Sequence, residues 1–458
     1  MSIEQSQVEQ ALEILGEGTR LDVLGERADL LRFAESQITA QHSERRLRVR
    51  VRTTRNGRSA AGSLETLEPA AVQTLADRLN AALADLPASP PARSSQAPSE
   101  PGARTGTIAV ESPGAALPEE APRVVAWPSV LQAEPADRHR WFSTVRDGLD
   151  SSTTLGGAIR YDVLDRVVAH SDGLFRAETL TKAAIQAIAK KGDNSVSVRA
   201  MHRDADQVPV NEIPDQLRTA LTPLPTWDAH RGPCRVLLKP QAVITLMATY
   251  GHFVLGATGY ATGRSAVAGR LGEKVVSDLI TLVDDGSDTD GLPSGFDAEG
   301  NVRRCTRLID RGILTGVVSD RRRAAVTGGV PTGHAVPDGW RFGGDPSPSN
   351  LLLAPGDVSD EELLAECGSG LVVNRLDYLR SLHPKQTLVT GTTRDGTYWA
   401  ENGELVAWHP QVRFTFRMDD VLNAVLAVGN TRECGDTTFM DSVVVPSLLI
   451  DAGPLVLP

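Results

Sequence analysis

The sequence lacks the segments that mark a secreted or membrane-spanning protein. Its first stretch, MSIEQSQVEQALEILGEG, has neither a basic region nor an apolar core, so it is not a signal peptide. No uninterrupted apolar run reaches the roughly 18 residues that a transmembrane helix needs. We therefore expect a cytoplasmic protein.

Cysteine and positive charge are also scarce. The 458 residues include four widely spaced cysteines, without a CxxC pair, which excludes a disulfide framework and a zinc ribbon. The 47 Lys and Arg residues face 58 Asp and Glu residues, for a formal net charge of −11. This acidic balance argues against nucleic-acid and membrane partners.

Common catalytic and phosphate-binding motifs are missing as well. There is no GxxxxGK[ST], no GxGxxG between a strand and a helix, and no GxSxG. The acidic run from Asp284 to Gly291 fits a calcium loop poorly. With Gly291 at the EF-hand glycine, Gly286 takes the first ligand position and Asp297 the closing one, so a polar loop is the better interpretation.

What is present predicts an α+β protein. Val8, Leu12 and Leu15 follow helical spacing up to Gly16. Residues 46–52 alternate Arg with Leu or Val, which predicts a strand with one apolar face, and Asn56-Gly57 predicts a tight hairpin turn. We interpret the arginine face as a solvated sheet face, with polyanion contact as the alternative.

The chain divides into two predicted α+β domains, residues 1–225 and residues 226–458. The first contains a long antiparallel meander and, at about 87–122, a Pro-, Ala- and Ser-rich excursion too poor in large apolar residues to fold. In the second, Pro240 starts a helix with Val243, Met247 and Tyr250 on one side. Asp419 and Asp420 predict the first turn of a last helix ending at Gly429.

The most distinctive segments lie in the second half: LGEKVVSDLITLVDDG, PSGFDAEGNVRRCTRLIDRGILTGVVSD and PSPSNLLLAPGDVSDEEL. With ENGELV and VLNAVLAVGN…VVVPSLLID, they resemble the TldD/TldE family, also called TldD/PmbA and formerly "modulator of DNA gyrase". The resemblance covers nearly the whole chain except the Pro-rich excursion. It implies a two-domain α+β fold, each domain having a largely antiparallel sheet flanked by helices.

The family's function divides by subunit. TldD-type members are zinc metalloproteases with a helical HExxxH motif and a distant cysteine, whereas TldE-type members lack the motif and pair with TldD as a heterodimer. The resemblance implies that the complex cleaves unfolded or extended peptides, including precursors of ribosomally made natural products.

At the place of the TldD motif this chain reads Leu246-Met247-Ala248-Thr249-Tyr250-Gly251-His252. Met247 stands at the first histidine, and a thioether suits Cu(I) better than Zn²⁺. Ala248 stands at the glutamate and cannot transfer a proton. We therefore expect no catalytic residue and no metal in this chain, with zinc in a TldD-like partner.

His252 and Cys434 are the remaining positions of the degenerate site, because Cys434 matches the family's ligating cysteine. On a regular helix Met247 and His252 are five residues, or about 140°, apart. They share a site only if the helix breaks near Gly251, as the resemblance implies. We favour a histidine hydrogen-bonded near a helix end and a small buried cysteine over residual metal ligands.

Two carboxylates in FDAEG, Asp297 and Glu299, are candidates for lining the peptide path or contacting the partner. Turn formation beside Gly295 and Gly300 is the equal alternative. We expect His334 to be a solvated loop histidine.

The sequence thus predicts a TldE-like, non-catalytic subunit of a heterodimeric peptide-processing metalloprotease. An active metallopeptidase using His252, Cys434 and a further ligand is one alternative. A stand-alone peptide-binding scaffold is the other.

Overall fold

A computed structural model describes residues 3–86, 125–226, 232–327, 329–337, 344–409, 411–451 and 456–457. The Pro-rich excursion predicted at about 87–122 lies outside the described residues. No described helix combines the length and the apolarity that crossing a membrane would require.

The first half of the chain forms one curved antiparallel sheet of six strands in the order β3-β2-β1-β4-β5-β6. The turn between β2 and β3 is the predicted Asn56-Gly57, with φ of 50° and 71°. The strands are β1 (Thr19–Ala34), β2 (Gln37–Arg55), β3 (Arg58–Leu64), β4 (Thr154–His170), β5 (Phe175–Lys191) and β6 (Asn194–His202).

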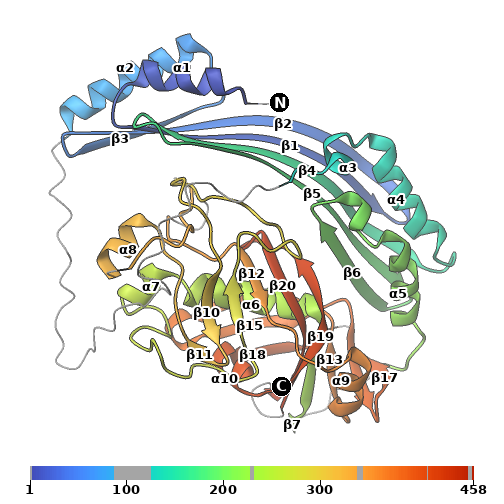
Figure 1. Cartoon of the computed structure of the whole chain (residues 1–458). Helices are drawn as coiled ribbons and strands as arrows, with labels where there is room; N and C mark the ends of the chain where they lie inside the picture. Colours follow the sequence, from blue (N-terminus) through green and yellow to red (C-terminus); the bar gives the residue numbers. More distant parts are fainter. Residues whose placement is uncertain are drawn as a thin grey trace.

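Helices cover only the convex face of this sheet (Figure 1). Leu21, Val23, Val49 and Val51 pack there against α1 (Gln5–Leu15) and α2 (Pro69–Asp85). The other end of the same face packs against α3 (Pro128–Leu131), α4 (Pro135–Asp147), η1 (Ala205–Gln207), η2 (Val210–Glu212) and α5 (Ile213–Ala220). Because side chains alternate along a strand, the arginines of β2 lie on the opposite, concave face.

The second half contains a ten-stranded mixed sheet in the order β11-β10-β9-β12-β20-β8-β13-β16-β17, with β19 also paired to β20. Its strands are β8 (Arg235–Leu238), β9 (Leu282–Asp284), β10 (Thr306–Asp310), β11 (Ile313–Leu314), β12 (Asn350–Leu353), β13 (Gly370–Val373), β16 (Thr397–Glu401), β17 (Glu404–Trp408), β19 (Val425–Gly435) and β20 (Ser442–Ile450).

The helix α6 (Pro240–Val254) lies between this sheet and a three-stranded sheet of β14 (Leu376–His383), β15 (Leu388–Thr393) and β18 (Arg413–Arg417). On the other face of the large sheet, α9 (Asp360–Cys367) packs against Leu237 and Leu449. The remaining elements are α7 (Ala257–Ala261), α8 (Arg321–Thr327), η3 (Pro384–Gln386), α10 (Met418–Asn423), β7 (Gly232–Pro233) and β21 (Val456–Leu457).

The predicted α+β class, with largely antiparallel sheets flanked by helices, is confirmed. One predicted element is wrong. The last helix, α10, ends at Asn423 instead of Gly429, because the following residues form β19 and pair with β20, starting at Val425 opposite Ile450. The predicted boundary between residues 225 and 226 falls between the two groups of strands.

The second half sits under the concave face of the first sheet (Figure 1). Arg166 on β4 donates through Nη1 to Ser294 Oγ at 2.8 Å, and the amide of Gly295 donates to Glu178 Oε2 on β5 at 2.8 Å. Polar contacts therefore hold the loop before FDAEG against the sheet.

A substitution at Gly18 probes how closely the backbone approaches the end of β2 at that position. Its φ is +70°, and a Cβ there would lie 2.2 Å from the carbonyl oxygen of Thr54. Gly192 has a φ of +60°, and a Cβ there would meet no atom within 4 Å. A substitution at Gly192 therefore measures the cost of the backbone conformation alone, without a steric clash. We expect Gly192→Ala to cost about 1 kcal/mol of stability and Gly18→Ala clearly more, since backbone must also move. Urea unfolding followed by circular dichroism checks this, and equal midpoints for the two variants would contradict it.

Candidate functional site

The degenerate motif lies in the middle of α6, where almost every side chain is buried. Met247 and Ala248 are both 0% exposed. Met247 belongs to the main core cluster together with Val243 and Tyr250, the packing that the sequence predicted. The thioether is therefore used as a core side chain, and Ala248 carries no group that could transfer a proton.

The helix does not break at Gly251. It continues without interruption to Val254, contrary to the break that the resemblance implied. Side chains approach α6 closely at Gly251, where a Cβ would lie 2.9 Å from Met440 Cε. With the helix intact, Met247 and His252 point about 140° apart around its axis and do not converge on one ion.

His252 lies in the last turn of α6 and packs among aromatic rings. It stacks on Phe439, with ring centroids 4.8 Å apart and planes 19° apart, and meets Phe253 edge-on at 4.9 Å. Burial lowers the pKa of His252, a shift that the nearby Asp345 carboxylate opposes only in part. The imidazole thus has a packing role in this structure.

Cys434 comes from β19, opposite Val444 of β20. Its Sγ lies 3.7 Å from Ser442 Oγ, and that hydroxyl also accepts a hydrogen bond from the amide of Leu292 at 3.0 Å. Burial raises the pKa of the Cys434 thiol to about 11. A zinc ligand must be a thiolate, so this environment favours the protonated, non-ligating form.

These residues do not fit a zinc ion. Within the part of the chain that the structure describes, no three His, Cys, Asp or Glu side chains gather as a metal would require. A catalytic zinc site needs three protein ligands and an open position. Here Met247 offers only a buried thioether, the His252 ring is stacked on Phe439, and the Cys434 thiol is neutral.

The FDAEG loop uses its acids to shape its own backbone. Asp297 is 0% exposed and accepts from the amides of Glu299, Asn301 and Ala335 at 2.8–2.9 Å. Glu299 accepts from the amide of Arg321, at the start of α8, at 3.0 Å. This geometry matches the turn-forming alternative for Asp297, and a peptide or partner contact stays a prediction for the half-buried Glu299.

His334 is not the solvated loop residue that we expected. It is 1% exposed, with Nε2 2.7 Å from Asp284 Oδ1 and Nδ1 2.9 Å from Thr332 Oγ1. The other oxygen of Asp284 accepts from the amides of Ser349 and Asn350. Although burial alone would raise the pKa of Asp284, His334 and the guanidinium of Arg303 hold it below its ordinary value.

Sequence reasoning missed this buried pair because 50 residues separate its members. The available signal was modest: Asp284 follows an apolar stretch and shares a strand face with the buried Leu282. The pair joins β9 to the loop after α8 and to the start of β12.

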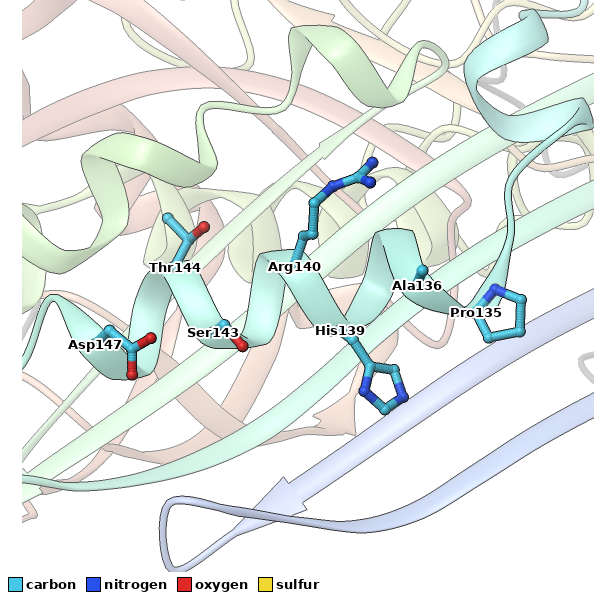
Figure 2. A pocket seen from close by; sticks show the side chains of 7 residues that line it. All are labelled: Pro135, Ala136, His139, Arg140, Ser143, Thr144 and Asp147. Carbon is cyan, nitrogen blue, oxygen red and sulfur yellow. The ribbon is translucent and has the colours of Figure 1, made fainter.

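A shallow hollow elsewhere has no link to these residues. It runs along α4 and is lined by Pro135, Ala136, His139, Arg140, Ser143, Thr144 and Asp147 (Figure 2). All seven side chains come from one helix on the convex side of the first sheet, away from α6 (Figure 1).

Comparison with known proteins agrees with this architecture. Residues 231–453 match the family model of the PmbA/TldA metallopeptidase C-terminal domain. A metalloprotease of Methanothermobacter thermautotrophicus is 35% identical over 131 residues, which cover 26% of this chain and 28% of that protein. The metalloprotease PmbA of Escherichia coli O157:H7 is 28% identical over 207 residues, covering 44% of this chain and 42% of that protein. The matched segments thus span less than half of these two relatives.

Two solved structures share the fold over nearly the full length. TldE from Thermococcus kodakarensis superposes with a TM-score of 0.82 at 17% identity, covering 98% of this chain and 100% of the other. A proposed modulator of DNA gyrase from Thermotoga maritima gives 0.76 at 18% identity, covering 96% of each chain.

The second half of the molecule is accordingly a PmbA/TldD-type C-terminal domain, and the whole chain has the fold of TldE. This half of the chain thus belongs to the PmbA/TldD family that the sequence motifs indicated.

Replacing the buried histidine should be costly. We expect His334→Ala to lower the free energy of unfolding by about 3–5 kcal/mol, because it leaves the carboxylate of Asp284 buried without its partner. His383 is exposed at the end of β14, so His383→Ala should change stability by less than about 0.5 kcal/mol. Chemical unfolding of both variants measures the difference, and two equally mild effects would show that the pair is not a structural support.

The same pair predicts an acid dependence. The folded pKa of Asp284 is lower than the ordinary value of 3.8 that it regains on unfolding. Its contribution is therefore complete above about pH 4 and is lost as the pH falls below that value. In Asp284→Asn this part of the acid sensitivity should disappear, which unfolding curves of both proteins between about pH 5 and pH 3 would reveal. Parallel loss of stability in the two proteins would contradict the assignment.

Proposed function

We propose that this chain is the non-catalytic, TldE-type subunit of a heterodimeric TldD/TldE-type zinc metalloprotease. The observation that carries the proposal is Met247-Ala248, fully buried in an unbroken α6 at the place of the HExxxH motif. The similarity to TldE supports it. The partner would hold the zinc and the glutamate, and this chain would supply one wall of the peptide path.

In this proposal the substrate is an unfolded or precursor peptide that lies extended and is held mainly through its backbone. Strand addition of this kind tolerates many sequences. Removal of leader peptides during the maturation of ribosomally made natural products is one such use. We propose a cytoplasmic location for the complex.

The active-metallopeptidase alternative requires His252 and Cys434 to bind an ion. The aromatic stacking of His252 and the raised pKa of the Cys434 thiol argue against it. The stand-alone scaffold differs from the proposal only in lacking an enzyme partner, so a partner experiment separates them.

The direct test compares this chain alone with the same chain co-expressed with a TldD-type protein that carries HExxxH. We expect one complex on size-exclusion chromatography, about one zinc per heterodimer, and cleavage of an unstructured peptide by the complex alone, since a catalytic zinc requires a full ligand set. Cleavage by the lone chain would reject the proposal. Failure of the two chains to associate would favour the scaffold.

His252 and Cys434, the two positions of the degenerate site that still carry possible ligands, should be dispensable in the complex. His252→Phe keeps the stacking on Phe439 but removes both ring nitrogens, and Cys434→Ala removes the thiol. If the partner holds the metal, each variant complex should retain zinc and cleave the peptide within about twofold of wild type, a difference of roughly 0.4 kcal/mol. A loss of a hundredfold or more, together with a loss of zinc, would restore the active-site alternative.

A further inference from the structure

The concave face of the first sheet is basic, although the chain as a whole is acidic. The register of β1 and β2 is regular from Thr19 to Arg32, so the even-numbered residues of both strands share this face. Among these described positions, three carboxylates, Asp22, Glu26 and Glu44, stand against six guanidinium groups. The latter belong to Arg20, Arg32, Arg46, Arg48, Arg50 and Arg52.

The carboxylates hold the arginines in place without neutralising all of them. Glu26 is shared: its Oε2 lies 2.8 Å from Arg48 Nη2, and its Oε1 lies 3.7 Å from Arg160 Nη2 on β4. Asp22 lies 3.6 Å from Arg50 Nη1. Arg46 pairs with Glu44. The side chains of Arg46 and Arg48 are nevertheless 59% and 44% exposed, so a ligand can reach both guanidinium groups.

The arginines of β2 form a ladder with a two-residue repeat. Successive members, from Arg46 to Arg52, are spaced by roughly 6.8 Å, which is also the spacing of alternate side chains in any extended chain. An extended peptide beside β2 would bring every second side chain to the concave face. Carboxylates at these positions would meet those arginines that lie beside an unpaired stretch of β2.

The backbone of β2 offers a place for such a peptide. Its pairing with β3 covers only Val49 to Arg55, whereas its pairing with β1 extends along the whole strand. From Gln37 to Arg48, no described strand pairs with the other edge of β2. A strand added there would continue the line of β3, next to Arg46 and Arg48, and would use backbone hydrogen bonds that do not depend on sequence.

We propose that this edge, together with Arg46 and Arg48 beside it, binds extended peptides that carry carboxylates at every second residue. The inference rests on the proposed function only in taking a peptide as the ligand. It adds a substrate class: the complex would favour acidic, extended segments, held beside the sheet that faces the second half of the chain.

Binding to the full-length chain alone tests the proposal by fluorescence anisotropy. The probe is a labelled twelve-residue peptide that alternates Glu and Ser. It is compared with a peptide that alternates Lys and Ser, and with one in which the six Glu residues are contiguous. We expect the alternating acidic peptide to bind at least several-fold more tightly than both others and more weakly as salt rises. Equal binding of the alternating and contiguous peptides would overturn the proposed register.

Matched variants locate the site. Arg48→Glu should weaken binding about tenfold, because it replaces attraction by repulsion next to the open edge. Arg45→Glu reverses another exposed charge on the same strand but on the convex face, and should change binding less than about twofold. Equal losses in the two variants would show that general charge, and not the concave face, attracts the peptide.

Two further probes separate the peptide from other polyanions and test the edge. One peptide is N-methylated at all Ser residues and a second at all Glu residues, so that each lacks the backbone donors of one edge. One of the two should bind more weakly, whereas unchanged affinity of both would overturn strand addition. A single-stranded oligonucleotide of equal charge should bind more weakly than the peptide, and equal binding would overturn the peptide as ligand. Because none of these measurements needs the partner, a failure of heterodimer formation is a separate result.

Discussion

The structure depends on burying one apolar helix from two sides. Between Pro240 and Val254, α6 fills the space between the ten-stranded sheet and the small sheet of β14, β15 and β18. Such a position desolvates most side chains of the helix, so a charged group among them would need full compensation by partners. Tyr250 and Met247 meet this constraint as packing groups, and Ala248 meets it by its small size.

The same constraint explains why the candidate site is incomplete in several places at once. An ion beside α6 would require a deprotonated thiol, a free imidazole and a carboxylate to converge in an apolar layer. Instead, burial keeps Cys434 protonated, and His252 is fixed by ring stacking on Phe439. Metal binding would need several coordinated changes, because restoring one ligand would leave the others unsuited.

Local sequence patterns predicted the elements whose stability is local. The alternation around Arg48 and the turn at Asn56-Gly57 specify β2, β3 and their register, since turn geometry and side-chain alternation act within a few residues. The stretch after Asn423 was misjudged because VLNAVLAVGN suits a helix and a strand alike. Its pairing with β20, which no local pattern encodes, decides for the strand. The Asp284–His334 pair escaped prediction for the same reason: it exists only once two distant segments meet.

The arginine face shows how tertiary placement changes the meaning of a pattern that was recognised correctly. From sequence, alternating arginines indicate a solvated sheet face, and Arg46 and Arg48 are indeed exposed. The fold adds the fact that this face is the concave one, turned toward the second half of the molecule, while helices cover the other (Figure 1). Glu26 and Asp22 hold neighbouring guanidinium groups at a spacing that their mutual repulsion would otherwise oppose. Charges arranged in this way on the inside of a curved sheet are better suited to a ligand that approaches the concave face than to solubility alone.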